Sequence, residues 1–143
     1  MRILFDTNII LDFLGKREPF SNNANALIKL CDAGTAFGGI AAHTIPDVFY
    51  ILRKQYTIDE RKSILIDLCE ILSVIGIDSQ ILMSALRNED FTDFEDCLQD
   101  ECAKIFNADY IVTRDPKGFL YSKIPIIDPV DLLKLLLPDD GQS

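Results

Sequence analysis

The fold is decided by residues 2–11, RILFDTNIIL, in which one apolar run stops at Asp6 and a second run begins at Ile9. The first run predicts a buried strand ending at Asp6, and the second predicts an apolar helix that starts two or three residues later. Ligands in open α/β sheets bind outside the carboxyl ends of the strands. Asp6, with Asn8 beside it, is therefore either a helix cap or part of a site for a metal ion or a phosphoryl group.

Strand and helix patterns alternate along the rest of the chain. This alternation calls for a mostly parallel central sheet covered on both faces, so we expect a three-layer α/β/α sandwich. The further strands are expected at residues 36–41, 73–77, 110–113 and 125–127. Helix starts are expected at Ser21, Thr44, Thr57, Asp78, Thr92 and Asp128, where Thr57 and Thr92 open capping-box patterns.

The chain of 143 residues is expected to form one domain over residues 1–137, followed by a loose polar tail at 138–143. The net charge of −9 argues against non-specific nucleic-acid binding through a broad basic face. It does not exclude a nucleic-acid enzyme, because an acidic metal site carries its own negative charge. No signal peptide or membrane span is recognisable, so we expect a cytoplasmic protein without membrane contact.

The chain has four cysteines and one histidine, His43. No two cysteines form a C-x-x-C pair, which argues against a structural zinc site. Each cysteine falls within an apolar helical pattern, so buried free thiols are expected. The cysteines are Cys31, Cys69, Cys97 and Cys102.

Acidic residues occur at three of the predicted strand-to-helix junctions. Asp6 ends the first strand, Asp47 lies in the first turn of the helix after the second, and Asp115 follows the strand at 110–113. All such junctions at one edge of a parallel sheet open to the same side. Taken singly, Asp47 could only favour a helix N-terminus and Asp115 could only start an Asp-Pro turn.

A fourth acid can come from the helix that begins near Thr92. Phe94, Cys97, Leu98, Cys102, Ile105 and Phe106 are expected to form its buried stripe. Asp93, Asp96 and Asp100 share an arc of about 100° beside that stripe. Asp93 and Asp96 reach the other acids if the helix returns tightly into the strand at 110–113; otherwise they face solvent.

Carboxylates held together raise one another's pKa and destabilise a fold, and divalent cations remove that cost. Hard cations such as Mg²⁺ and Mn²⁺ prefer oxygen ligands, so an all-carboxylate set fits them better than zinc. Two such ions about 3.5–4 Å apart can stabilise the attacking and leaving oxygens of a phosphodiester.

Four motifs make the chain resemble the PIN-domain family of metal-dependent ribonucleases. They are FDTN at 5–8, TIPD at 44–47, DFEDCLQ at 93–99, and IVTRD at 111–115 followed by Phe119. The third is similar to the family's DFEDALQ, and the third and fourth are the more specific. In order of elements, the resemblance covers residues 1 to about 137.

The resemblance implies hydrolysis of RNA phosphodiester bonds with Mg²⁺ or Mn²⁺ as cofactor. It also implies similarity to small bacterial VapC-type toxins, which are commonly homodimers held inactive by an antitoxin peptide. Mapped by motif, the catalytic and metal-binding residues would be Asp6, Asp47, Asp96 and Asp115. The supporting residues would be Asn8, Asp93 and Thr113.

Two features depart from the family pattern or limit substrate binding. The family usually has Glu where Asp47 stands, and Asp is one methylene shorter, so Asp47 could act less directly on a metal. Positive charge near the acids is scarce. Arg114 and Lys117 flank Asp115 and are the candidates for holding RNA phosphates.

Three other functions are compatible with parts of the pattern. A haloacid-dehalogenase-type phosphatase also begins with a strand and D-x-D, but Asn8 stands at its second acid. A phosphoreceiver domain needs an Asp after its third strand, where Asp78 is found, but it also needs an acidic pair at the first strand. A PIN-like fold that has become a weakly active or inactive RNA- or protein-binding module is the third alternative.

Overall fold

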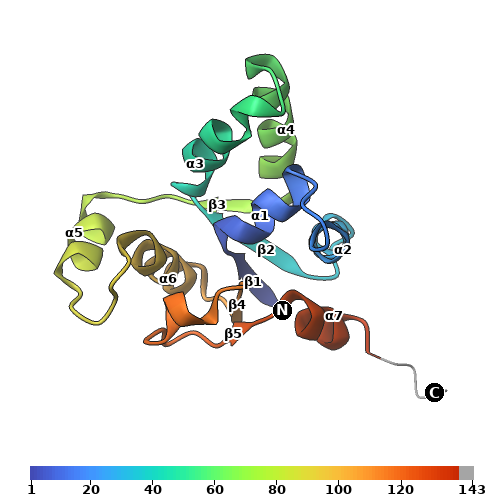
Figure 1. The fold of residues 1–143 in the computed structure, drawn as a ribbon. Coiled ribbons are helices and arrows are strands. Elements are labelled where there is room, and N and C mark those ends of the chain that lie inside the picture. Colours follow the sequence, from blue (N-terminus) through green and yellow to red (C-terminus); the bar gives the residue numbers. More distant parts are fainter. Residues whose placement is uncertain (139–143) are drawn as a thin grey trace.

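The computed structural model describes residues 1–138. Its five strands form a single, entirely parallel sheet in the order β3-β2-β1-β4-β5 (Figure 1). In chain order the elements are β1 (Arg2–Phe5), α1 (Thr7–Leu14), α2 (Ser21–Asp32), β2 (Phe37–Ala41), α3 (Thr44–Ile51), the 3₁₀ turn η1 (Leu52–Lys54), α4 (Ile58–Ile71), β3 (Ser73–Ile75), α5 (Ser79–Arg87), α6 (Phe94–Phe106), β4 (Tyr110–Val112), the 3₁₀ turn η2 (Pro116–Phe119), β5 (Ile126–Ile127) and α7 (Pro129–Leu136).

Helices cover both faces of the sheet, which confirms the predicted α/β/α sandwich. Alternate side chains of β1 point to opposite faces, as strand geometry requires. Ile3 and Phe5 pack with α1, α2, α3, α4 and α7, whereas Leu4 packs with α6. Helix α5 packs on α6 and not on the sheet (Figure 1). The larger core therefore lies on the side of α1 and α2.

Gly39 of β2 lets α6 approach the sheet closely, whereas Gly38 faces Leu72 and Cys31 on the opposite side of the sheet. A Cβ added at Gly39 would lie 2.9 Å from the Phe106 ring and 2.8 Å from Ile75. No larger side chain fits there without moving α6. Gly39 therefore sets the distance at which the C-terminal end of α6 packs on the sheet.

Strand β1 lies at the point where the strand order reverses. The connections from β1 lead to β2 and β3 on one side, and β4 and β5 lie on the other. Phe5 pairs with Val112 at the carboxyl ends of β1 and β4, and the Asp6 amide donates to the Val112 carbonyl at 3.1 Å. A crevice at such a point is where open α/β sheets bind ligands.

Several local predictions need correction. Helix α1 begins at Thr7, directly after Asp6, and Asp6 is its N-cap. Helix α2 starts at Ser21 as expected, but its N-cap is Phe20, and the Ser21 hydroxyl donates to Glu18 at 2.9 Å instead of capping the helix. The capping box at Thr57 is confirmed. The second predicted box is wrong, because Asp93 and not Thr92 caps α6.

The predicted buried stripe and thiols are also only partly right. Phe94 and Ile105 are 41% and 52% exposed, so the buried stripe of α6 is narrower than expected. Cys69 is exposed on α4, whereas the other three cysteines are buried and all four are free. The predicted loose tail lies, apart from Pro138, outside the described residues. Within residues 1–138, every helix is too short or too polar to cross a bilayer.

Candidate metal centre

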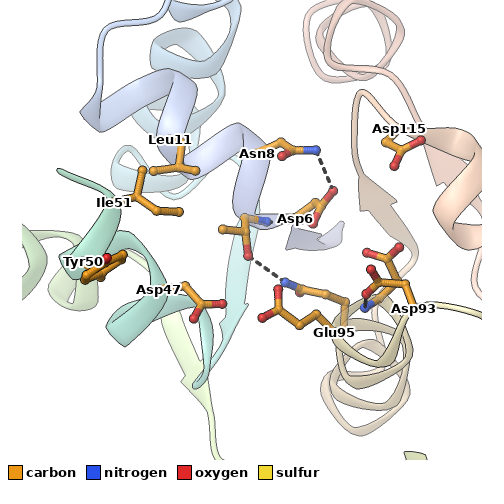
Figure 2. Close-up of a pocket in the computed structure, with 12 residues that line it drawn as sticks. Asp6, Asn8, Leu11, Asp47, Tyr50, Ile51, Asp93, Glu95 and Asp115 are labelled. Atoms are coloured by element: carbon orange, nitrogen blue, oxygen red, sulfur yellow. Dashed lines mark hydrogen bonds between the residues drawn. The ribbon is translucent and has the colours of Figure 1, made fainter.

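A cavity of about 510 Å³ opens at the carboxyl ends of β1 and β4 (Figure 2). It brings together residues from four segments: the start of α1, the helix α3, the start of α6 and the loop after β4. Six carboxylates line it: Asp6, Asp47, Asp93, Glu95, Asp96 and Asp115. Asn8, Gln99 and Tyr50 also contribute to the lining.

Asp6 is buried and is held by groups on both neighbouring segments. Its Oδ1 accepts from the Thr7 amide at 2.8 Å, and its Oδ2 accepts from the Thr113 hydroxyl at 2.8 Å. Asn8 adds a longer bond of 3.4 Å to the same Oδ2. Burial raises the pKa of Asp6, the Thr113 and Thr7 bonds lower it, and the charge of Asp115 raises it. Asp6 is thus both a helix cap and a wall of the cavity.

Thr113 links the two acids that follow β1 and β4. Its hydroxyl donates to Asp6 and accepts from the Asp115 amide at 2.9 Å. Figure 2 shows the Asp115 carboxylate on the β4 side of Asp6. Gly118 leaves room on this side, since an added Cβ there would lie 3.3 Å from Asp115 Oδ2 and would strike the Asp96 carboxylate. Asp96 and Asp115 therefore lie against the same point of the backbone.

Asp96 carries the strongest sign of crowding by like charges. Burial and, to a smaller extent, the charges of Asp93, Asp6 and Asp115 together raise its pKa from 3.8 to about 7. The Asp96 amide donates to the capping carboxylate of Asp93 at 3.0 Å, which places both acids at the start of α6. The start of α6 therefore lies beside the other acids, as expected if this helix leads into β4 by a tight return. Asp100 is elsewhere, buried against Ser122 and Lys104.

Asp47 faces Glu95 across the cavity, away from Asp115 (Figure 2). Ligand atoms of His43, Asp47 and Glu95 all lie within 4.8 Å of one another. Burial and the neighbouring Asp47 carboxylate raise the pKa of Glu95, while burial lowers the pKa of His43. Among residues 1–138, no other three side chains of His, Cys, Asp or Glu bring their ligand atoms within 4.8 Å of one another. The carboxylates around Asp6 lie further apart than this.

A network of polar side chains lies between the acids around Asp6 and the group of His43, Asp47 and Glu95. Gln99 is 1% exposed, and its Nε2 donates to the hydroxyls of Thr7 at 3.0 Å and Thr44 at 3.2 Å. The two hydroxyls also bond to each other at 2.9 Å. Because Thr7 and Thr44 begin α1 and α3, this network ties both helices to α6. Gln99 Oε1 is left without a partner.

The basic residues flanking Asp115 do not line the cavity. The Arg114 guanidinium makes two bonds to the fully buried Asp12, at 2.7 and 2.9 Å, and stacks on Phe20. It therefore holds the loop of Asp115 against α1 and α2. Lys117 is exposed on η2.

A different aromatic–basic pair lies at the cavity rim. Tyr50 is 62% exposed and lines the cavity, and the Arg53 guanidinium stacks 3.9 Å from its ring centroid.

The predicted residues Asp6, Asn8, Asp47, Asp93, Asp96 and Asp115 all line one cavity, and Thr113 is bonded to Asp6 beside it. The sequence did not identify five residues in or beside the cavity: His43, Glu95, Gln99, Thr7 and Thr44. Glu95 and Gln99 were within the motif at 93–99, but the expected cap at Thr92 assigned Glu95 to a capping bond. His43 gave no signal because Glu95, the third member of its group, comes from α6.

The donor set is suited to divalent cations. Six carboxylates line the cavity, and burial together with mutual repulsion raises the pKa of Asp6, Glu95 and Asp96. A bound cation would remove that repulsion, and oxygen donors of this kind suit Mg²⁺ and Mn²⁺. The residues present therefore fit such a cation.

The sequence and the fold both have recognisable relatives. A family model described as "PIN domain" matches residues 2–117. Among curated proteins, none matches the chain significantly. Three solved structures are similar in fold: VapBC2 from Rickettsia felis bound to a promoter DNA fragment (20% identity, TM-score 0.63), DNA-bound VapBC from Salmonella typhimurium (18%, 0.63) and FitAcB from Neisseria gonorrhoeae (16%, 0.61). Each match covers 90% of this chain and 98% of the other.

Proposed function

Since the chain belongs to the PIN-domain family, we propose that it is a divalent-metal-dependent endoribonuclease that hydrolyses phosphodiester bonds in RNA. The observation that carries this proposal is the crowding of carboxylates from β1, α3, α6 and the loop after β4 around one cavity. Without a bound cation, such crowding of carboxylates lowers the stability of the folded protein.

In this proposal Asp6, Asp96 and Asp115 hold Mg²⁺ or Mn²⁺, with Asp47 on the opposite wall. The cation, when bound, supplies a Lewis acid for the phosphate and a more acidic water. Thr113 keeps the Asp6 carboxylate oriented by donating to it. Asp96, whose pKa is raised to about 7 when no cation is bound, must release its proton to bind the cation, so binding is expected to weaken below neutral pH.

The rim of the cavity supplies contacts for a single strand. The exposed ring of Tyr50 offers a surface on which a base can stack, and Arg53 beside it offers a positive charge to the phosphates. Lys117 is a further phosphate contact because it is exposed close to Asp115. Arg114, by contrast, is assigned to holding the loop, since Asp12 occupies its guanidinium.

The proposal is tested by cleavage of short fluorescent RNAs with Mg²⁺ or Mn²⁺ and with a chelator. Metal-dependent cleavage that is lost in Asp6→Asn and Asp96→Asn, but kept in the control Asp67→Asn on the exposed face of α4, supports it. No cleavage of any RNA, or cleavage that survives both variants, contradicts it. Phosphate release from a small phosphoester, or an acyl-phosphate on Asp6 or Asp78, would favour the phosphatase or phosphoreceiver alternative.

We further propose that the chain is the toxin of a toxin–antitoxin pair, active as a homodimer in the cytoplasm and inhibited by an antitoxin peptide. The support is its similarity in fold to chains from VapBC and FitAcB complexes. Growth arrest on expression, relieved by Asp6→Asn, is the expected result, together with a small open reading frame next to the gene. Arrest that persists with Asp6→Asn would contradict the toxin role, and the molar mass in solution tests the dimer.

A further inference from the structure

We infer that His43, Asp47 and Glu95 form a separate cation site of mixed nitrogen and oxygen ligands, which prefers a transition metal such as Zn²⁺ to Mg²⁺. The three side chains come from two elements. His43 immediately precedes α3, Asp47 lies one turn into that helix, and Glu95 lies in the first turn of α6. One ligand atom from each lies within 4.8 Å of the other two.

Unsatisfied polar atoms gather around this triad. Within residues 1–138, the buried side-chain polar atoms that lack a hydrogen-bond partner are both ring nitrogens of His43 and Oε1 of Gln99. Gln99 is 1% exposed, lines the same cavity as Asp47 and Glu95, and is bonded to Thr44, the residue after His43. A buried polar group without a partner costs about 1–3 kcal/mol.

A cation would supply the missing partners. Imidazole nitrogen binds a metal directly, and water in the shell of a metal can donate to an amide oxygen such as that of Gln99. The same cation would neutralise the two carboxylates that face each other at Asp47 and Glu95 (Figure 2). The unpartnered nitrogens, the unpartnered oxygen and the paired carboxylates thus have one common explanation.

The ligand chemistry selects the metal. Imidazole suits zinc, iron, nickel and copper, whereas Mg²⁺ takes oxygen ligands and keeps most of its water. The Asp6, Asp96 and Asp115 group has only carboxylates and suits Mg²⁺ or Mn²⁺. Two neighbouring sites in one cavity would therefore differ in preference. Glu95 is the longer side chain here and meets the shorter Asp47 from the opposite wall.

The inference concerns cation binding and does not rest on RNA cleavage. If the His43 site fails to bind a transition metal, the proposed nuclease activity at Asp6, Asp96 and Asp115 is not contradicted. If the protein fails to cleave RNA, the metal site is still tested by its own readout. That readout is available because His43 is the only histidine in the chain.

The test is NMR of the His43 imidazole nitrogens in tag-free protein labelled with ¹⁵N, titrated with Zn²⁺ and separately with Mg²⁺. We expect Zn²⁺ to shift one ring nitrogen in a saturable, one-to-one manner and Mg²⁺ at the same concentration to leave both unchanged. Binding at the exposed thiol of Cys69 would not move these resonances. A titration without a His43 shift overturns the inference.

Three variants separate the triad from a lone histidine. Glu95→Gln and Asp47→Asn should each weaken the Zn²⁺ response by about tenfold or more, since even outer-shell partners of metal ligands are worth that much. Glu101→Gln, on the same helix but outside the cavity, should leave the midpoint unchanged. An unchanged midpoint in both triad variants overturns the inference. Dispersed amide spectra establish that each variant is folded.

Discussion

Replacing Asp96 by Asn should stabilise the protein in the absence of divalent cations. The Asp96 carboxyl lies at the start of α6 among Asp93, Asp6 and Asp115, and burial together with these charges raises its pKa from 3.8 to about 7. A carboxyl whose pKa is raised by folding disfavours the folded state once the unfolded chain can ionise. The amide of Asn has nearly the same shape and cannot carry the charge.

The size of the effect follows from the shift. Each pKa unit corresponds to about 1.4 kcal/mol, so a shift of about three units would give about 4 kcal/mol for a fully buried group. Asp96 is only partly buried, so solvent screening reduces this to about 1–2 kcal/mol. For a chain of this length, that raises the melting temperature by about 3–8 °C.

The sign and the pH range can both be checked. At about pH 4 Asp96 is mostly protonated in the folded state, so the variant gains little. Between about pH 4 and pH 7 the unfolded chain loses the proton and the folded protein keeps it, so the advantage of Asn grows; above about pH 7 it is constant. The assay is thermal unfolding by circular dichroism in chelator at several pH values, with Asp67→Asn as the control.

The same samples test the cation. Mn²⁺ should raise the melting temperature of the wild type and should do so much less in Asp96→Asn, because a ligand that binds only the folded state stabilises it. Affinity of the wild type for Mn²⁺ should fall by about tenfold from about pH 8 to pH 6, as protons occupy Asp96. If the variant is less stable than the wild type in chelator, or gains equally from Mn²⁺, the reasoning about crowded acids is refuted.

Three further substitutions test the surroundings of the cavity. Thr113→Val removes the hydroxyl that bonds Asp6 and should cost about 1–3 kcal/mol in urea unfolding, with recovery in Thr113→Ser; an unchanged stability would contradict this role. Arg114→Ala leaves Asp12 buried without its counter-charge and should lower the free energy of unfolding by about 3–5 kcal/mol. The double variant with Asp12→Asn should recover part of this loss. Tyr50→Ala, at an exposed position, should weaken single-stranded RNA binding by about 1–3 kcal/mol without changing the melting temperature; binding is measured by fluorescence anisotropy in chelator.

The overall architecture could be predicted because strand and helix patterns alternate along the whole sequence. Strand-to-helix junctions of a parallel sheet open to one side, and this alone brings Asp6, Asp47 and Asp115 to one edge. Placing α6 needed one more assumption, a tight return into β4. The bonds of Gln99 to Thr7 and Thr44 hold the first half of α6 beside the other acids.

Other features depended on contacts that no local pattern reveals. Arg114 and Asp12 are 102 residues apart in the chain, so the sequence did not reveal their ion pair. Because of this pair, Arg114 holds the loop of Asp115 in place. A shift of one residue in the cap of α6, from Thr92 to Asp93, frees Glu95 to reach across to Asp47. The exposed thiol of Cys69 was missed because helical periodicity does not state which face lies against the core.

Whether the acids around Asp6 bind a cation can be seen in an anomalous difference map from crystals grown with Mn²⁺. We expect a Mn²⁺ peak bound by the carboxylates of Asp6, Asp96 and Asp115, and no such peak in crystals of Asp96→Asn. A map without a peak in this cavity, or with Mn²⁺ bound only at acids elsewhere on the surface, would contradict it.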